Sequence, residues 1–542
     1  MEFNQISYTA TAKIELDTSA DFGATIVSNN WDSATGNGII SFDGVVTSIG
    51  EKAFYNCSSL TSIILPETIT RIGKYAFQNC SSLMSMTIPN SVTEIGEYAF
   101  MRCTGELLVN CNISQYAFYN AKFTKAIIGE GVEVIDNSAF SDCSSLTSIT
   151  IPNSVTKIGE RAFYYCSSLT SITLPQSITS ISKEAFFRCS KLASITIPNS
   201  VTKIGESAFY ECSGLTSMTI PNSVTEIGSS AFDYCTGELW VNCNIPQDAF
   251  YYAKFTKAII GEGVEKIGRS AFRCCSNLIS ITLPNTITSI GNNAFSECSS
   301  LTSITIPNSI TEIPESCFEN CSSLTSMTIP DGVTKIGEGA FNHCSSLREF
   351  KSKYASADGR CIIFDGVLNA FAPAGLTEYT IPIEVTEIGR WSLAYCSNIE
   401  KLTLSQNVTS VGYGALAYFT GELIVNSNNI EVNSYYNQMT KLTFGNSVVS
   451  IGDYTFANLK YLTSIVIPSN ITSIGRQAFY NCNELTSIYI KATTLPSLGN
   501  DAFYGHTSDR KIYVPSAVVD KYKKANVWKN YADFIVPDPT KD

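Results

Sequence analysis

The chain has 542 residues, of which 44% are apolar and only 15% are charged, and its formal net charge is −12. This composition is typical of a folded protein, and an acidic balance without a basic run argues against nucleic acid as a partner. The sequence contains only two histidines, His343 and His506. A histidine-based metal site or a Ser-His-Asp triad therefore has almost no material from which to be built.

The N-terminal residues 1–37 contain two β-like segments, ISYTATAKIEL and GATIVS, with little repeat character. We expect them to form a β-rich cap over the array that follows, because the terminal repeat of such an array would otherwise expose its core. The chain as given does not start with a cationic segment and an apolar run, and it contains no stretch of 18 consecutive apolar residues. These features predict neither a secretory signal nor a membrane span.

A 23-residue unit repeats across residues 38–505. Its pattern is L-x-x-I-x-L-P-x-x-I-x-x-I-G-x-x-A-F-x-x-C-x-x, in which Leu60 is position 1. The Ala-Phe pair at positions 17 and 18 recurs in frame, with leucine versions at Leu393 and Leu416 and one degenerate copy near Ser434, which gives about 20 units. One unit cannot bury its own apolar face, whereas stacked units share a continuous core. The sequence therefore predicts one elongated, right-handed solenoid in place of several globular domains.

Within each unit, the segment L-x-x-I-x-L alternates in and out at a period of two residues, which predicts a short strand. Positions 4 and 6 then point inward, positions 3, 5 and 7 point outward, and the proline at position 7 closes the strand. Because the units stack in register, these strands form a parallel sheet. Its outward side is mostly uniform, with serine at position 3 and threonine at position 5.

Three irregular blocks interrupt the array. Residues Cys103–Phe140 nearly repeat at Cys235–Phe272 and align without gaps, in a diverged form, with Phe419–Phe456. Each block replaces two 23-residue units by units of 18 and 22 residues. A different interruption, Leu347–Thr380, contains an insertion at residues 348–380. Its sequence predicts a hairpin turning at Asp365-Gly366, a pair favoured in two-residue turns that need positive φ.

The C-terminal residues 506–542 are expected to form a second cap. They contain a last strand at residues 512–515 and a predicted helix from Ser516 to about Lys529. Val518, Tyr522, Ala525 and Trp528 recur at helical spacing and form one apolar face. This pattern predicts that Trp528 belongs to the cap and not to a binding site.

The 19 cysteines invite a disulfide or metal interpretation, but 14 of them stand at position 21 of the repeat. At the same position stand Ala121, Ala253, Phe419 and Leu459, which share only apolarity with cysteine. Free cysteine behaves as a small buried hydrophobe, so we expect a ladder of reduced, packed thiols. The alternative is local pairing of Cys103 with Cys111 and of Cys235 with Cys243, two pairs that are lost together in the third block.

The glycines and carboxylates have structural interpretations. The G-E-G sequences at 129–131 and 261–263 replace the P-N-S turn, outside any dinucleotide-binding context. The glycine at position 14 is expected to serve close packing, since Pro314 can replace it and proline demands negative φ. Glu94, Glu97 and Glu226, at positions 12 and 15, are expected on a solvated rim. No catalytic motif stands out, so the sequence predicts neither an enzyme nor a cofactor or metal site.

The L-x-x-I-x-L strand followed by I-G-x-x-A-F-x-x-C-x-x-L resembles the BspA-type leucine-rich repeat family of bacterial and protist surface proteins. The resemblance covers roughly residues 38–505. It implies a right-handed curved solenoid with the parallel sheet on its concave side and the Ala-Phe segment on its convex side. It also implies a non-catalytic role in adhesion or in binding a host or matrix protein or a glycan, at a cell surface or after secretion. We expect a monomer.

The irregular blocks are the candidate binding surface. In this interpretation each places a bulky apolar residue outward at position 3, and the next unit places a lysine at its own position 3. Trp240 would then lie about 5 Å from Lys257, close enough for a cation–π contact. Two alternatives remain: the shorter units bury these side chains, or block duplication copied them without a role, which fits a spacer protein with no specific ligand. The candidate ligand-binding residues are Leu108, Lys125, Trp240, Lys257, Ile424 and Lys441.

Overall fold

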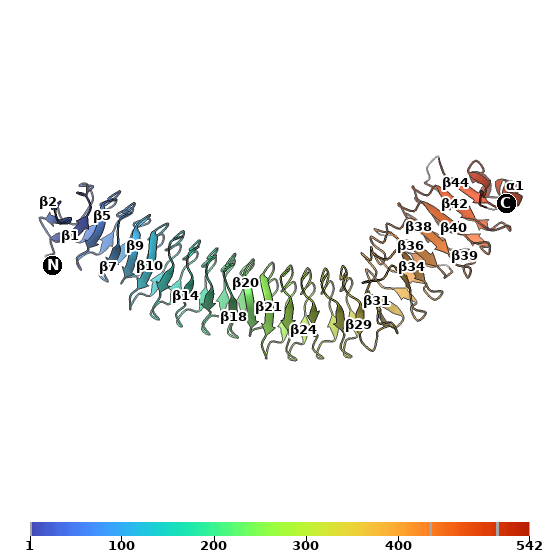
Figure 1. The fold of residues 1–542 in the computed structure, drawn as a ribbon, viewed down its shortest axis with the longest axis horizontal. Helices are drawn as coiled ribbons and strands as arrows, with labels where there is room; N and C mark the ends of the chain where they lie inside the picture. The colour runs from blue at the N-terminus through green and yellow to red at the C-terminus, as the bar shows by residue number, and fades with distance from the viewer. Residues whose placement is uncertain (1–2, 429, 433–435, 506–508, 541–542) are drawn as a thin grey trace. The chain divides into compact units, whose positions relative to one another are not determined.

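The computed structural model describes residues 3–428, 430–432, 436–505 and 509–540. The chain forms a parallel-strand solenoid of about 21 turns, which confirms the predicted stacking of repeats (Figure 1). It divides into two compact units, Met1–Ile287 and Thr288–Asp542. The degenerate repeat copy near Ser434 and the histidine His506 lie outside the described residues.

Each regular turn has three sides. A long strand covers the region of positions 3 to 6, a short strand covers positions 12 and 13, and a turn segment carries the Ala-Phe pair. In one turn these strands are β12 (Ser148–Thr150) and β13 (Lys157–Ile158). Equivalent positions pair from turn to turn, as in Ser148 with Ser171. The outward side chains of the long strands form a surface that we call the strand face.

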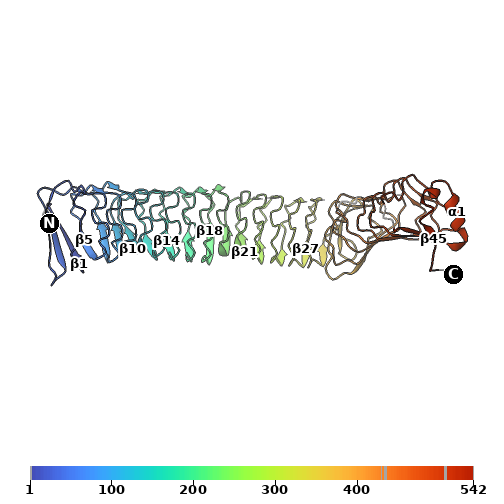
Figure 2. The ribbon, with the colours of Figure 1, turned by 90° about the horizontal axis from the view of Figure 1, so that it is seen from above.

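The first unit contains two rows of parallel strands (Figure 2). Its long strands are β5 (Leu60–Ile64), β7 (Ser85–Ile88), β9 (Thr104–Val109), β10 (Lys122–Ile128), β12, β14 (Ser171–Thr173), β16 (Ser194–Thr196), β18 (Ser217–Ile220), β20 (Thr236–Val241), β21 (Lys254–Ile260) and β23 (Ser280–Thr282). Its short strands are β4 (Ser48–Ile49), β6 (Arg71–Ile72), β8 (Glu94–Ile95), β11 (Val134–Ile135), β13, β15 (Ser180–Ile181), β17 (Lys203–Ile204), β19 (Glu226–Ile227) and β22 (Lys266–Ile267).

The second unit, described by itself, also contains a row of long strands and a row of short strands. Its long strands are β25 (Ser303–Ile304), β27 (Ser326–Thr328), β29 (Glu349–Lys351), β32 (Glu378–Thr380), β34 (Lys401–Leu404), β36 (Glu422–Val425), β38 (Lys441–Phe444), β40 (Ser464–Ile467), β42 (Ser487–Ile490), β44 (Lys511–Val514) and β45 (Ile535–Pro537). Its short strands are β24 (Ser289–Ile290), β26 (Glu312–Ile313), β28 (Lys335–Ile336), β31 (Val367–Phe371), β33 (Glu387–Ile388), β35 (Ser410–Val411), β37 (Glu431–Val432), β39 (Ser450–Ile451), β41 (Ser473–Ile474) and β43 (Ser497–Leu498).

The Ala-Phe segment is a turn with two residues in the left-handed region, at positions 16 and 20. In one repeat these are Tyr75 at φ 57° and Asn79 at φ 64°. Such a conformation costs about 1 to 2 kcal/mol for a residue with a Cβ. The segment is held by hydrogen bonds to the next turn, in which the Phe54 N–H donates to the Ala76 carbonyl at 2.7 Å. The inter-turn bonds therefore fix a conformation for which the sequence carries no glycine signal.

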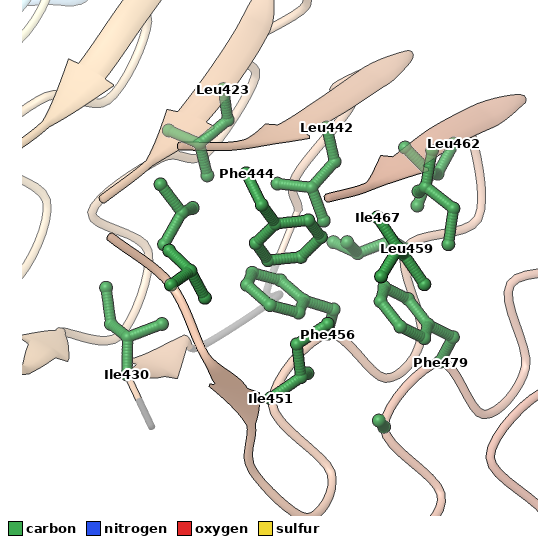
Figure 3. Close-up of a cluster of buried hydrophobic side chains, with 14 of the residues drawn as sticks. Leu423, Ile430, Leu442, Phe444, Ile451, Phe456, Leu459, Leu462, Ile467 and Phe479 are labelled. Carbon is green, nitrogen blue, oxygen red and sulfur yellow. The ribbon is translucent and has the colours of Figure 1, made fainter. Parts of the chain in front are cut away.

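Phenylalanine rings at position 18 stack from turn to turn inside the solenoid. Phe54 and Phe77 have ring centroids 5.0 Å apart and nearly parallel planes. In the second unit Phe456 stacks on Phe479 at 5.7 Å, and Phe444 meets Phe456 edge-on (Figure 3). Figure 3 also shows Leu459, at position 21, beside this cluster, and it is buried like the cysteines that it replaces.

The repeat glycine at position 14 packs closely against the preceding turn, as the sequence predicted. Gly73 lacks positive φ, and a Cβ on it would lie 2.5 Å from the backbone nitrogen of Glu51. In the second block, a Cβ on Gly261 would meet the side-chain oxygen of Asn242 at 2.2 Å. Both glycines thus let the neighbouring turn approach closely.

All 19 cysteines are buried free thiols, and the predicted packing ladder is confirmed. Most position-21 thiols donate a hydrogen bond to the phenylalanine carbonyl of the preceding turn, as Cys80 does to Phe54 at 3.2 Å, whereas Cys57 donates to the Glu15 carbonyl. The alternative pair Cys103 and Cys111 is not bridged, and the Cys103 thiol instead donates to the Phe77 carbonyl at 2.8 Å.

We expect these thiols to be unreactive in the folded protein. Burial raises the pKa of Cys111 to about 12 and that of Cys243 to about 11, and the thiolate is the reactive form. Thiol titration of native protein should therefore be slow, whereas protein denatured without reductant should titrate with most of its cysteines free. A denatured sample in which most cysteines are unreactive until reduction would contradict the packing ladder.

The N-terminal strands form an antiparallel sheet over the first long strand. They are β1 (Gln5–Ala10), β2 (Ile26–Trp31) and β3 (Asn37–Phe42), and the sheet order is β2-β3-β1-β5. β1 runs antiparallel to β5, so the Leu60 strand pairs with a partner from outside the repeat array. The apolar residues Ile6, Tyr8 and Ile40 of this sheet are buried.

The C-terminal segment contains three short helical pieces in place of the single helix predicted from Ser516. They are η1 (Ser516–Val518), α1 (Val519–Lys524) and η2 (Trp528–Tyr531). The helix ends because Ala525 is extended and Val527 has φ 63°. Trp528 is nevertheless buried, and its indole N–H donates to the Pro496 carbonyl at 2.9 Å. Its predicted place in the packed C-terminal segment is confirmed.

The insertion forms the predicted hairpin between β30 (Cys361–Phe364) and β31, with Asp365 and Gly366 both at positive φ. β31 then pairs with β33 in the short-strand row, and the chain returns to β32 without an Ala-Phe segment. The turns on either side consequently meet each other directly. The guanidinium of Arg390 lies 3.1 Å from the carboxylate of Glu338. The rings of His343 and Tyr395 are 3.6 Å apart between centroids, across 52 residues of sequence.

Candidate ligand-binding surface

The strand face is uniform over the regular turns. Serines at position 3 and threonines at position 5 pair with their equivalents on the next strand, as Thr173 does with Thr196. Thr173 and Thr196 are exposed, and Ile172 between the two rows is buried. The alternation predicted from the sequence is thus confirmed for these turns. Short hydroxyl side chains alone give little area for a binding hot spot.

The register at the second block differs from the prediction. Trp240 lies at position 5, where it pairs with Thr219 on β18 and with Ile259 on β21. Lys257 pairs with Glu238, and its ammonium nitrogen is 4.0 Å from that carboxylate. The predicted contact between Trp240 and Lys257 is therefore wrong.

The same shift of two residues applies to the other blocks. Leu108 pairs with Ile127, and Ile424 pairs with Thr443. All three bulky residues thus stand in the threonine row and not in the serine row. The three lysines do lie at position 3, as predicted, because each pairs with a serine of the next regular strand: Lys125 with Ser148, Lys257 with Ser280 and Lys441 with Ser464.

The shift arises because fewer residues connect the position-21 cysteine to the strand that follows it in the block. Cys212 lies five residues before Ser217, whereas Cys235 lies only three before Glu238. The missing residues are replaced by a tight connection at Gly237, which has φ 92° and on which a Cβ would lie 2.5 Å from the backbone of Thr216. A gap of two residues keeps the alternation of inward and outward side chains. The outward direction of the three bulky residues was therefore predicted correctly, but their assignment to the serine row was not.

The block residues are partly exposed. Trp240, Leu108 and Ile424 are half-buried, Lys257 is half-buried, and Lys125 and Lys441 are exposed. The alternative in which the short units bury these side chains completely is wrong. Each of the first two blocks therefore presents two adjacent outward apolar residues beside a glutamate and a lysine.

Fluorescence can measure this exposure. We expect acrylamide to quench Trp240, since its indole is half-exposed, while Trp528 is buried and should be protected. The measurement compares quenching of the wild type with that of Trp240→Phe, whose remaining tryptophans supply the background. Equal quenching curves for the two proteins would show that Trp240 is inaccessible.

A ladder of alternating charge at position 3 begins two turns before the third block and runs into it, from Glu378 to Lys441. Lys401 lies 3.7 Å from Glu378, and Lys441 lies 3.1 Å from Glu422. Burial acts to raise the pKa of Glu422, but hydrogen bonds from Thr443 and Lys441 hold this pKa below its usual value. This end of the strand face thus carries charges of both signs that are paired with each other.

An aromatic segment of the strand face was missed by the sequence analysis. After Thr443, position 5 carries Val466, Tyr489 and Tyr513, all half-buried. The two tyrosine rings stack at 4.6 Å, and the ammonium of Lys491 lies 5.4 Å from the Tyr489 ring centroid. The signal was present in the sequence, because valine and tyrosine replace the expected threonine in the last repeats.

A polar trough of about 620 Å³ lies on the strand face beside the second block. Its floor is formed by β16 and β18, with Ser194, Thr196 and Thr219 among the lining residues. Asn242, which follows β20, and Glu262, which follows β21, close one side. Because Thr219 pairs with Trp240, the indole stands next to the trough.

The charged residues at positions 12 and 15 form paired rims, as their predicted exposure allows. Each predicted glutamate has a basic partner at the same position of a neighbouring turn, and all of these side chains are well exposed. Such exposed pairs are screened by solvent and contribute little to stability. The pairs are Arg71–Glu94 at 3.3 Å, Lys74–Glu97 at 3.0 Å and Lys203–Glu226 at 2.8 Å.

Metal-binding clusters and membrane-spanning helices are both missing from the part of the chain that the structure describes. No group of three or more histidine, cysteine or acidic side chains there is arranged to hold a metal ion. Within the same residues, no helix has both the length and the apolar character needed to cross a membrane.

Comparison with known proteins gives one family and several solved structures. The profile of the BspA type leucine rich repeat region matches six copies, over residues 26–109, 111–238, 243–356, 368–437 and 428–529. A leucine-rich repeat protein from Bacteroides ovatus is 32% identical over 56% of this chain and 82% of that chain, with a TM-score of 0.47. The T. pallidum leucine rich repeat protein is 31% identical over 34% of this chain and 81% of that chain, with a TM-score of 0.27. A leucine rich cell surface protein from Faecalibacterium prausnitzii is 23% identical over 74% of this chain and 89% of that chain, with a TM-score of 0.29. No curated protein matches.

Proposed function

Because the chain belongs to the BspA-type leucine-rich repeat family, we propose that it is a non-catalytic binding protein that presents its strand face to an extracellular ligand. In this proposal the protein acts at a cell surface or after secretion, as a monomer and without a cofactor. The ligand contacts the irregular blocks, at Leu108, Lys125, Trp240, Lys257, Ile424 and Lys441.

The observation that carries this proposal is the coincidence of two departures from the repeat. The blocks replace the serine and threonine rows, and the replacements are half-exposed apolar residues beside a glutamate and a lysine. A half-exposed tryptophan gains less from folding than a buried one, whereas tryptophan is among the residues that dominate binding energy at interfaces. Trp240, between Thr219 and Ile259, is the strongest single case.

A spacer role has support of its own. The turns between the first two blocks present unbroken serine and threonine rows, from Ser148 and Thr150 to Ser217 and Thr219. Such a surface suits a spacer segment, which keeps the parts on either side of it apart and does not itself bind a ligand. Under this second candidate the block residues have no ligand, so binding measurements separate the two roles.

The proposal is tested by probing protein and glycan arrays with the purified chain. For any ligand that binds, the double variant Trp240→Ala/Lys257→Ala should lower binding. The matched control is Glu226→Lys, which alters the rim and not the strand face. Absence of any ligand supports the spacer role, and a ligand whose binding responds to the rim variant alone would contradict the strand-face proposal.

A further inference from the structure

We propose that the trough beside Trp240 binds a neutral oligosaccharide. This inference depends on the proposed function, because it names the ligand class for part of the same strand face. All residues that form the trough belong to the first unit, from Ser194 in β16 to Glu262, which follows β21. Its volume, about 620 Å³, falls within the range of about 300 to 1,000 Å³ that is typical of small-ligand sites.

The residues that line the trough supply hydrogen-bonding groups of the kinds that can pair with sugar hydroxyls. Ser194, Thr196 and Thr219 offer hydroxyls that both donate and accept, while Asn199 and Asn222 add amides that do the same through separate atoms. Asn199, Asn222 and Thr219 are exposed side chains. A sugar ring carries hydroxyls of the same dual character on its edge, so the two sets of groups are chemically matched.

The charge of the trough selects against acidic ligands. Among the described residues that line it, Glu262 is the only charged one. The nearest lysine of the block, Lys257, is engaged by Glu238 at 4.0 Å. Recognition of sulfate, phosphate or carboxylate groups needs arginine, lysine or clustered backbone N–H donors. A neutral ligand therefore fits the site better than a sulfated or sialylated glycan or an acidic peptide.

The indole of Trp240 completes the site. Trp240 does not line the trough itself: it is half-exposed on β20, the next strand, and is flanked on its own row by Ile259 and by Thr219, which does line the trough. An aromatic side chain offers large, rigid, apolar area at low entropic cost, which suits the C–H face of a pyranose ring. A ligand that extends from the trough onto β20 would thus meet polar groups first and the apolar face of the indole next, which matches the two-sided surface of a sugar.

The first block offers a natural comparison. A hollow on the two long strands that precede that block is lined by Phe3 and Ile64, both exposed apolar side chains, together with Ser62 and Thr87. Leu108 occupies the position of the tryptophan. The repeat fold therefore permits an apolar hollow at this place, and the combination of a polar floor and an indole is particular to the second block.

The experiment uses the full chain and panels of immobilised glycans: neutral fragments of mannan, galactan and β-glucan against sialylated and sulfated oligosaccharides. We expect binding within the neutral panel. For the neutral glycan that binds, Trp240→Ala should weaken binding about tenfold or more, Trp240→Phe should retain most of it, and Asn222→Ala should weaken it. Glu226→Lys, which alters the exposed rim and not the strand face, is the control and should leave binding unchanged. Circular dichroism and thermal melting confirm that each variant is folded.

The outcomes separate this inference from the proposed function. Preference for acidic glycans, or unchanged binding by Trp240→Ala, overturns the inference. A protein ligand that is lost in the block variants, with no glycan bound, also overturns it but leaves the strand-face binding role intact. Failure of every glycan and protein ligand overturns both.

Discussion

Replacing Phe209 by alanine is expected to lower the free energy of unfolding of the first unit by about 3 to 5 kcal/mol. The Phe209 ring is fully buried, and it stacks on Phe186 at 5.4 Å and on Phe232 at 5.5 Å. Its removal loses apolar burial and both ring contacts, and leaves a cavity that the close-packed turns cannot fill. Chemical denaturation followed by circular dichroism measures the loss.

The matched control is Phe209→Leu. Leucine occupies this repeat position naturally at Leu393 and Leu416, and both are buried. We expect the leucine variant to lose clearly less stability than the alanine variant, because it keeps most of the buried volume. Equal stability of Phe209→Ala and the wild type would show that the ring stack contributes little to the stacking of turns.

Replacing Asp233 by asparagine is expected to stabilise the protein at neutral pH by about 2 to 3 kcal/mol. The Asp233 side chain is buried, and its Oδ1 atom has no hydrogen-bond partner. Burial raises the pKa of this carboxyl to about 6, against a hydrogen bond from Ser230 that lowers it. Folding at pH 7 therefore places an ill-solvated charge inside the first unit, and the amide removes that charge at nearly constant shape.

The sign of the pH dependence follows from the raised pKa. The folded state binds the Asp233 proton more tightly than the unfolded chain, so the protonated carboxyl favours folding at low pH, and this contribution is lost as the pH rises through about 6. The advantage of Asp233→Asn should be small near pH 4 and reach a plateau above pH 6 to 7. Thermal melts at several pH values measure it, with the half-exposed Asp248→Asn as control. A pH-independent difference between Asp233→Asn and the wild type would contradict the raised pKa.

The repeat features that the sequence predicted correctly are those that depend on contacts between identical positions. Phe54 meets Phe77 and Cys80 meets the turn before it because a fixed spacing brings equivalent residues together. The hairpin at Asp365 was predictable for a different reason, since an Asp-Gly pair specifies its own turn geometry. In these places local chemistry and the repeat point to the same structure.

The errors arise where the repeat changes length. Nothing in the sequence of the second block says where its missing residues fall, and a gap of two preserves the alternation of inward and outward positions. Trp240 was therefore predicted to face outward correctly but was assigned to the wrong neighbour. The left-handed residues such as Tyr75 carry no signal, because hydrogen bonds between turns, and not glycine, hold them in place. The contact of His343 with Tyr395 depends on how the insertion returns to the array, which spacing alone does not encode.

The direct junction between the turns of Glu338 and Arg390 has a consequence for cooperativity. In a stacked array, each turn transmits its stability only to its neighbours, so the free energy of the whole is a sum of nearest-neighbour couplings. The phenyl stack that couples Phe318 to Phe341 ends there, and the next two turns carry Leu393 and Leu416. The direct contacts between the turns of Glu338 and Arg390 include an exposed ion pair and a ring contact of His343, in place of a stacked phenyl pair. Amide hydrogen exchange should therefore show a step in opening free energy at the insertion, with the turns on its two sides unfolding as separate cooperative segments.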